Sequence, residues 1–121
     1  MYSITVMIHA SNWREGLDWY QSIFPGCIRH QETDGEFEFI SVGEFAIEVV
    51  QADSKVSSGC AGTVVYWQTN DFNARLRFLL SKGATLFRGP MDLKNGVRMC
   101  QVLDPFGNPF GIRGYSKQLQ P

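Results

Sequence analysis

The chain has 121 residues and a mass of 13.7 kDa, which suffices for one compact domain and is too short for two independent ones. Hydrophobic residues make up 44% of it and charged residues 19%, a composition that excludes disorder as the main state. Eleven Lys and Arg stand against twelve Asp and Glu, and the basic residues are scattered along the chain, so no nucleic-acid partner is expected.

Membrane and secretory segments are not expected either. The longest apolar runs, such as residues 45–47 and 63–67, are too short to cross a bilayer. The N-terminus has no basic start and no small-residue cleavage site, which argues against a secretory signal. The three cysteines, Cys27, Cys60 and Cys100, form no CxxC pair, zinc pattern or disulfide framework. These features together predict a cytoplasmic protein.

The first half of the chain has the order strand, helix, strand, strand, strand. Apolar side chains alternate with others over residues 4–9, which is the period of a half-buried strand. Asn12 is a good N-cap for a helix with apolar residues three and four apart, and Pro25-Gly26 ends that helix. Strand-like runs follow at residues 27–30, 36–42 and 45–51, with turns at residues 33–35 and 43–44.

The second half repeats this order. Asp71 takes the capping place of Asn12, and the predicted helix ends at Lys82-Gly83. Strand-like runs cover residues 63–67, 85–88, 97–103 and 110–113. Because neither half is large enough to bury its sheet alone, we expect one domain. Its parts are module 1 at about residues 1–52, a hinge at 53–61, module 2 at about 62–114 and a tail at 115–121.

Three stretches of the sequence carry a resemblance to a known family. Residues 17–26 (LDWYQSIFPG) resemble its first helix, and residues 45–49 (FAIEV) resemble the strand that closes its first module. Residues 103–112 (LDPFGNPFGI) are close to its Asp-Pro-x-Gly-Asn turn, the most specific of the three motifs. With these motifs the chain resembles the vicinal oxygen chelate superfamily, which includes glyoxalase I, extradiol dioxygenases, and fosfomycin and bleomycin resistance proteins.

The resemblance implies an α+β fold in which two βαβββ modules form an incomplete eight-stranded barrel around a ligand cavity, with the helices outside. It also implies a homodimer. If Ile4, Val6 and Ile8 pack against the helix, strand alternation points the intervening side chains into the cavity. The cavity-facing residues expected in this way include Thr5, Met7, His9, Glu48, Val64, Tyr66 and Arg113.

Metal-dependent members of the superfamily place one ligand on each of four strands, and the resemblance carries these places onto Thr5, Glu48, Val64 and Gly111. Only Glu48 can bind a metal, whereas a divalent ion needs at least three strong protein ligands. His9, further along the first strand, does not restore the set. We therefore expect no metal and no other cofactor. Glyoxalase, dioxygenase and fosfomycin-transferase chemistry are disfavoured, because all three use the metal.

Each candidate side chain also has a structural interpretation. Glu48 is a counter-charge for a cationic ligand or a general base; the structural alternatives are a carboxylate at the solvated rim of the cavity and one paired with Arg98 or Arg113. His9 donates a hydrogen bond to a ligand or is a structural histidine. Met7 and Tyr66 stack on a flat ligand or pack in the core. The strand alternation around Arg98 is ambiguous, and an inward Arg98 belongs to the expected cavity.

Three functions remain open. The leading hypothesis is metal-free binding of a small molecule, such as an antibiotic or another aromatic or cationic compound, and the aromatic content of 13% and Glu48 favour it. The second is a lyase- or dioxygenase-like enzyme of the same fold, with metal ligands at other positions or with Glu48 and His9 as an acid–base pair. The third is an interaction module whose cavity its own side chains fill, such as Met7, Tyr66 and Met99. No catalytic residue is assigned.

Overall fold

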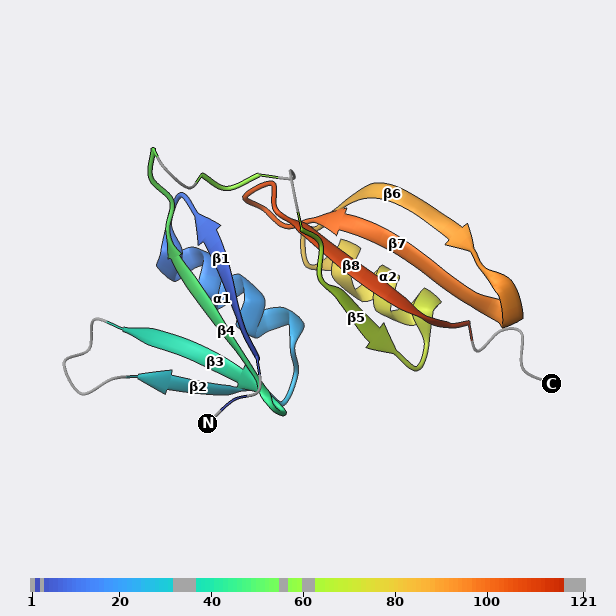
Figure 1. Cartoon of the computed structure of the whole chain (residues 1–121), viewed down its shortest axis with the longest axis horizontal. Helices are drawn as coiled ribbons and strands as arrows, with labels where there is room; N and C mark the ends of the chain where they lie inside the picture. The colour runs from blue at the N-terminus through green and yellow to red at the C-terminus, as the bar shows by residue number, and fades with distance from the viewer. Residues whose placement is uncertain (1, 3, 32–36, 55–56, 60–62, 117–121) are drawn as a thin grey trace. The chain divides into compact units, whose positions relative to one another are not determined.

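A computed structural model of the chain describes residues 2, 4–31, 37–54, 57–59 and 63–116. The chain divides into two compact units, Met1–Ser58 and Gly59–Pro121 (Figure 1). Their boundary falls within the hinge predicted at residues 53–61. The turn predicted at residues 33–35, Cys60 and residues 117–121 of the predicted tail lie outside the described residues.

The first unit is a four-stranded mixed sheet with one helix. Its strand order is β1-β4-β3-β2, with β1 parallel to β4 and the other neighbours antiparallel. Its elements in chain order are β1 (Ile4–Ala10), α1 (Trp13–Ile23), β2 (Ile28–Gln31), β3 (Glu38–Val42) and β4 (Phe45–Gln51).

Helix α1 begins and packs as its sequence predicts. The Asn12 side chain accepts a hydrogen bond from the Glu15 backbone N–H at 3.1 Å, as expected of an N-cap. Leu17, Tyr20 and Ile23 form its buried face against the strands of the first sheet. Each such apolar side chain stabilises the unit by roughly 1.5–3 kcal/mol on burial, so this face holds the helix on the sheet.

The second unit has the same arrangement. Its strand order is β5-β8-β7-β6, with β5 parallel to β8 and the other neighbours antiparallel. The Asp71 side chain caps α2 by accepting from the Ala74 backbone N–H at 3.2 Å. The elements are β5 (Tyr66–Thr69), α2 (Phe72–Ser81), β6 (Thr85–Asp92), a short 3₁₀ helix η1 (Lys94–Gly96), β7 (Val97–Leu103) and β8 (Pro109–Tyr115).

The Asp-Pro-x-Gly-Asn motif forms the turn between β7 and β8. Asp104 is buried, and its Oδ1 accepts from the backbone N–H of Phe106 at 2.8 Å and of Asn108 at 2.9 Å. The Asn108 side-chain amide donates to the other Asp104 carboxylate oxygen at 3.1 Å. The motif is therefore a structural feature that fixes the path of the chain between two strands.

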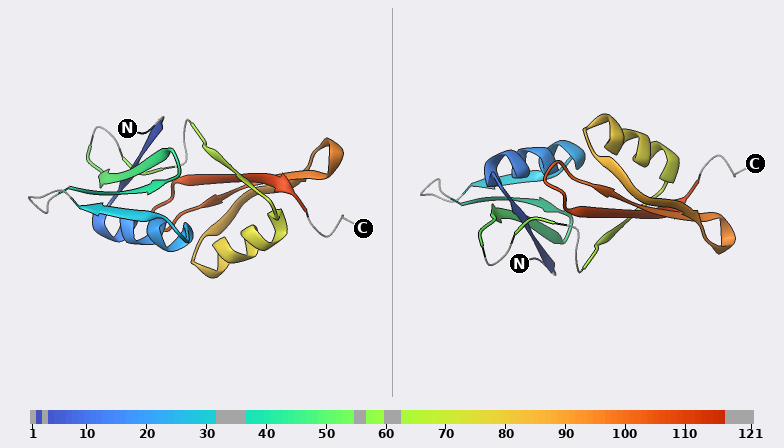
Figure 2. Two further views of the ribbon diagram at one scale, coloured as in Figure 1. Left: turned by 90° about the horizontal axis from the view of Figure 1, so that it is seen from below. Right: turned by 90° about the horizontal axis from the view of Figure 1, so that it is seen from above.

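The observed elements confirm an α+β fold with two βαβββ modules. In Figures 1 and 2, α1 lies against one face of the first sheet and α2 against one face of the second. The two open four-stranded sheets agree with the expected incomplete barrel. In the described part of the chain, no helix combines the length and the apolar composition needed to cross a bilayer.

Two strands, β5 and β6, differ most from the sequence prediction. β5 begins at Tyr66 and not at residue 63. β6 continues to Asp92, beyond the end predicted before Gly89-Pro90. Its register against β7 shifts between Leu86 and Arg88 and again between Arg88 and Met91. Gly89 and Pro90 lie in the second irregularity, and the pairing with β7 resumes at Met91.

Candidate functional site

Each sheet has a helix face and an open face, the open face being the one turned away from α1 or α2. In the first sheet Ile47 is fully buried on the helix face, so alternation places Glu48 on the open face. The ladder pairs Glu48 with Met7 of β1. Thr5 and His9 lie on the same face of β1, which brings four of the predicted residues together.

Glu48 is half-buried on this open face. Among the described residues its carboxylate has no hydrogen-bond or ion-pair partner. The neighbouring Met7 side chain is 53% exposed. The open face of the first sheet therefore presents one uncompensated negative charge beside apolar surface.

The second sheet places Tyr66 and Arg113 on its open face. Ile112 is fully buried on the helix face, so Gly111 and Arg113 face the other way. The ladder sets Tyr66 on one side of Gly111 and Gln101 on the other, and it sets Met99 beside Arg113.

Arg98 lies on the helix face, which corrects the expectation that it lines the cavity. Its guanidinium donates to Asp92 of β6 at 2.7 Å and to the Asn73 side chain of α2 at 2.8 Å, and it lies over the Phe72 ring. The buried Cys100, two residues further along β7, lies on the same face. The sequence of β7 has apolar residues on both of its faces, so alternation alone did not show which face Arg98 occupies. The contacts of Arg98 with Asn73 and Phe72 of α2 show that it is the helix face.

Val64 is not part of a strand. It precedes β5, which begins at Tyr66, and so it has no position on the ladder of the second sheet. The side chain that occupies the corresponding open-face position of β5 is that of Tyr66.

A cavity of about 220 Å³ lies on the open face of the second sheet. Two rows of side chains cross it, because the ladder sets Arg88 beside Gln101 and Met91 beside Met99. The first row is polar and the second consists of thioethers. The complete lining is Tyr66, Arg88, Gly89, Met91, Met99, Cys100 and Gln101.

The Tyr66 ring lies over Gly111. A Cβ at Gly111 would lie 2.6 Å from the Tyr66 Cδ1 atom and 2.8 Å from Cγ and Cε1, so the glycine provides the space that the ring occupies. The Gln101 side-chain amide donates to the Tyr66 hydroxyl at 2.9 Å. The ring is thereby fixed at both ends as one wall of the cavity.

The bulge in β6 explains why sequence reasoning missed Arg88 and Met91. Residues three apart in a regular strand point to opposite faces. Because the register shifts between them, both of these residues pair with open-face residues of β7. Gly89 in the bulge has φ +84°, and a Cβ there would lie 3.0 Å from the Met91 nitrogen and the Met99 carbonyl oxygen. The only sequence signal for the bulge was the Gly89-Pro90 pair.

The environment of Cys100 keeps its thiol protonated at neutral pH. Burial raises the pKa of its thiol to about 11, and the nearby Arg98 guanidinium offsets part of this rise. Burial likewise raises the pKa of Cys27, whereas a backbone hydrogen bond and Arg29 act in the opposite direction. Both thiols therefore stay protonated, and the thiolate is the reactive form.

The resemblance gives four positions for metal ligands, and their side chains are Thr5, Glu48, Val64 and the hydrogen of Gly111. Thr5 offers only a hydroxyl, Val64 offers no donor, and the Tyr66 ring fills the space for a side chain at Gly111. Glu48 alone carries a carboxylate. Within the described ranges no group of three or more His, Cys, Asp or Glu side chains is placed to hold a metal ion. These residues do not fit a divalent metal.

An aromatic cluster on the open face of the first sheet was not predicted. The His30 ring stacks on Phe39 at 4.6 Å between centroids, and Tyr2 lies edge-on to both rings. His30 Nε2 lies 2.8 Å from the Ser41 hydroxyl and 3.3 Å from that of Tyr2. Ser41 is only 7% exposed, so this contact lies within the packed sheet.

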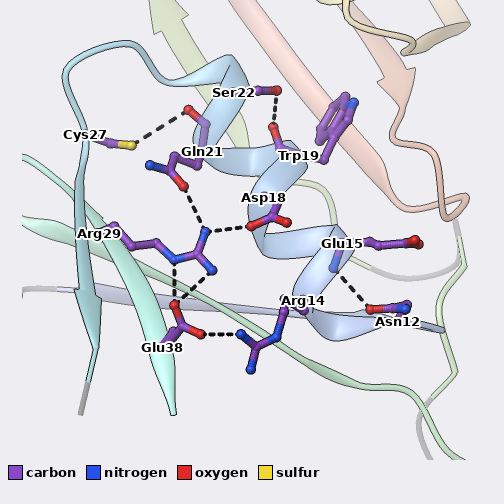
Figure 3. A network of polar contacts seen from close by, with 10 residues as sticks. All are labelled: Asn12, Arg14, Glu15, Asp18, Trp19, Gln21, Ser22, Cys27, Arg29 and Glu38. Atoms are coloured by element: carbon purple, nitrogen blue, oxygen red, sulfur yellow. Dashed lines mark hydrogen bonds and ion pairs between the residues drawn. The ribbon is translucent and has the colours of Figure 1, made fainter. Parts of the chain in front are cut away.

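Figure 3 shows a polar network on the helix face of the first sheet. Glu38 is buried and binds Arg29 at 3.0 Å and Arg14 at 3.2 Å, while Arg29 also donates to Asp18 and Gln21 of α1. The carboxylate is thus neutralised by two cations and fastens α1 to the sheet. It borders a second cavity of about 200 Å³, lined by Trp13, Phe37, Glu38, Val49, Val50 and Gln51.

No family model and no curated protein matches this sequence. Solved structures do match it along nearly its whole length. A glyoxalase/bleomycin resistance protein/dioxygenase family enzyme from Burkholderia phytofirmans has a TM-score of 0.73 and 18% identity, over 91% of this chain and 95% of that one. A member of the same superfamily from Sphaerobacter thermophilus has a TM-score of 0.72 and 18% identity, over 94% and 97%. This is the vicinal oxygen chelate fold.

A glyoxalase/bleomycin resistance protein from a Streptomyces species also shares the fold. Its TM-score is 0.65 at 19% identity, over 90% of this chain and 96% of that chain. Of the four positions that the resemblance gives for metal ligands in this fold, only Glu48 carries a carboxylate in this chain.

Proposed function

We propose that this chain is a metal-independent binding protein for a small aromatic compound, and a member of the vicinal oxygen chelate superfamily. The observation that carries the proposal is the cavity of the second unit, which combines an aromatic ring, two thioethers and hydrogen-bonding groups. A mostly apolar lining with a few polar groups is typical of small-molecule sites. Thioethers adapt to ligand shape and favour contacts with aromatic rings.

The size of the cavity limits the ligand. Its volume of about 220 Å³ is below the roughly 300–1,000 Å³ of pockets that enclose drug-sized ligands. A compound of one or two rings suits this volume. A large antibiotic would place only one of its rings in the cavity, and we therefore propose a small ligand.

The side chains in the described part of the chain offer no donor set that fits a metal, and this supports binding over metal-assisted chemistry. The Tyr66 ring occupies the space of one former ligand position and also forms a wall of the cavity. The same side chain that closes the metal position thus contributes to the ligand surface. Because Tyr66 forms an open wall of the cavity and does not fill it, this arrangement supports a binding site over an interaction module with a filled cavity.

Two measurements on the purified full chain test the proposal. Mass spectrometry of protein purified without chelators or metal-affinity resin should find no stoichiometric transition metal. A thermal-shift screen of one- and two-ring aromatic fragments should find compounds that raise the melting temperature. We expect Tyr66→Leu to weaken their binding, whereas Tyr115→Leu, at an exposed tyrosine outside the cavity, serves as the matched control.

The alternatives predict other results. One transition metal per chain would overturn the proposal of metal-independent binding and favour an enzyme. No thermal shift with any fragment would favour an interaction module. Binding that Tyr66→Leu leaves unchanged would place the ligand outside the cavity.

We also propose that the protein is a cytoplasmic homodimer. Cys27 and Cys100 are free thiols, which the reducing cytoplasm maintains. The strands β1 and β2 are the edges of the first sheet, and β5 and β6 are those of the second; sheet edges are natural surfaces for pairing or cover. Sedimentation equilibrium should give twice the chain mass of 13.7 kDa, and a single chain mass would contradict the dimer.

A further inference from the structure

We infer that the cavity of the second unit takes an aromatic anion, whose oxyanion group binds Arg88 and the Tyr66 hydroxyl while its ring lies against Met91 and Met99. This inference rests on the proposed function and adds the charge and the orientation of the ligand. Three observations carry it: the charge of the unit, the hydrogen-bond donors of the cavity and the arrangement of its two rows.

The net charge of the chain conceals two oppositely charged halves. Residues 59–121 contain eight Lys and Arg and three Asp, a formal charge of +5. Residues 1–58 contain three Lys and Arg and nine Asp and Glu, a formal charge of −6. A surface with an excess of one sign attracts ligands of the other sign. The second unit therefore favours an anion.

All three carboxylates of the second unit are engaged away from the cavity. Asp71 caps α2, Asp92 pairs with Arg98, and Asp104 holds the turn after β7. Arg88 lines the cavity and has no hydrogen-bond or ion-pair partner in the described part of the chain. A cation in the cavity would meet an arginine and no carboxylate.

The polar groups of the cavity are arranged as donors. A guanidinium offers up to five N–H groups and accepts none, and it binds a carboxylate through two parallel hydrogen bonds. The Tyr66 hydroxyl accepts from the Gln101 amide, which leaves its own proton to donate. An oxyanion, which only accepts, satisfies both groups.

The second row of the cavity suits the ring of the same ligand. Met91 and Met99 lie side by side on β6 and β7, directly next to the row formed by Arg88 and Gln101. Thioether sulfur interacts favourably with aromatic rings, and the Tyr66 ring adds an aromatic wall. The polar row and the thioether row thus match the two ends of an aromatic carboxylate.

The experiment uses the full chain labelled with ¹³C at the methionine methyl groups. The sequence has four methionines, of which Met91 and Met99 line the cavity and Met7 lies on the open face of the first sheet. Naphthoate, naphthamide and naphthylmethylammonium are titrated as probes that share a ring system and differ in charge. We expect naphthoate to shift the Met91 and Met99 signals and leave Met7 unchanged. Naphthoate should bind about tenfold more tightly than naphthamide, because its carboxylate forms a charge-assisted hydrogen bond that the neutral amide cannot form.

Arg88→Gln removes the charge and retains a polar side chain. We expect it to reduce naphthoate affinity about tenfold and to leave naphthamide affinity unchanged. Arg77→Gln, at an exposed arginine of α2 outside the cavity, is the matched control and should change neither. The methionine spectrum and the melting temperature of each variant report whether it is folded.

The outcomes separate this inference from the proposed function. Equal binding of all three probes at Met91 and Met99, or naphthoate binding that Arg88→Gln leaves unchanged, would overturn the anion inference alone. Preference for naphthylmethylammonium with a shift of Met7 would place the ligand beside Glu48 and overturn it as well. No signal shift with any probe, together with no hit in the fragment screen, would overturn both.

Discussion

The Tyr66 ring and Gly111 are sterically complementary, because the ring occupies the space that a side chain at residue 111 would need. The ring needs the space of a missing Cβ, and the glycine would leave a gap in the open face without the ring. Gly111 has an extended backbone that any residue adopts, since its φ is not in the left-handed region. Steric room, and not backbone freedom, therefore selects glycine at this position.

We predict that Gly111→Ala destabilises the protein by about 1–3 kcal/mol, because the new methyl group collides with the Tyr66 ring. The hydrogen bond from Gln101 to the Tyr66 hydroxyl should be lost with the displaced ring. Urea unfolding measures the change. In a Tyr66→Ala background the same glycine substitution should cost much less, and an equal cost in both backgrounds would contradict the steric explanation.

Cys100 should make stability depend on pH in the alkaline range. Its folded pKa is about 11, above its ordinary value of about 9, so between these values the unfolded thiol is ionised while the folded one keeps its proton. The stability that the buried thiol provides is therefore fully present below about pH 9 and is lost as the pH rises to about 11.

We predict that the free energy of unfolding of the wild type falls on the order of 2 kcal/mol more than that of Cys100→Ala over this range. Denaturant unfolding at a series of pH values measures both proteins. The comparison cancels the titration of the other alkaline groups. Parallel pH profiles would show that the thiol makes no such contribution.

At the level of elements, the Arg29 network explains how α1 is fixed to β2 and β3. Figure 3 shows the Arg29 guanidinium between Glu38 on the sheet and Asp18 and Gln21 on the helix. The Glu38 side chain is 8% exposed and that of Asp18 is 64% exposed. Because water screens the exposed pair, the two ion pairs should differ in their contribution to stability.

We predict that Glu38→Gln destabilises the protein by about 1–3 kcal/mol, since it leaves a half-buried guanidinium with fewer charged partners. Asp18→Asn, the matched control on the exposed side of the same arginine, should cost less than about 1 kcal/mol. Chemical denaturation gives both values. A larger loss of unfolding free energy in Asp18→Asn than in Glu38→Gln would contradict the prediction that the Arg29–Glu38 pair contributes more than the Arg29–Asp18 pair.

The elements were largely predictable, because their signals are local. The cap residues Asn12 and Asp71 and the apolar spacing after them predicted both helices. The bulge in β6 was not predictable in this way. A Gly-Pro pair usually marks the end of a strand, because proline has no N–H to donate to the ladder. The pairing with β7 shows that β6 nevertheless continues past Gly89-Pro90.

For the whole molecule, the division of charge between the halves has the clearest functional consequence. The formal charge of −1 describes neither half, since one carries −6 and the other +5. Composition alone gave no indication of a charged ligand. The boundary between the compact units is what makes this charge separation visible.

The candidate site was predictable only in part. Alternation in β1, β4 and β8 predicts Met7, Glu48 and Arg113 on one face of their sheets, because side chains of a regular strand point alternately to its two faces. The sequence left the alternation around Arg98 ambiguous, and it did not indicate that Arg88 lines a cavity. The position of Arg98 depends on its contacts with α2, and that of Arg88 depends on a bulge.

The sequence by itself determined the two βαβββ modules, their helix caps and the turn at Asp104, since each follows from residue types at short spacing. The tertiary structure decided which side chains share a cavity. Arg88, Met91, Met99 and Gln101 meet Tyr66 only through the register of β5, β6, β7 and β8. Such register comes from pairing between distant segments and from bulges, and short-range patterns do not encode it.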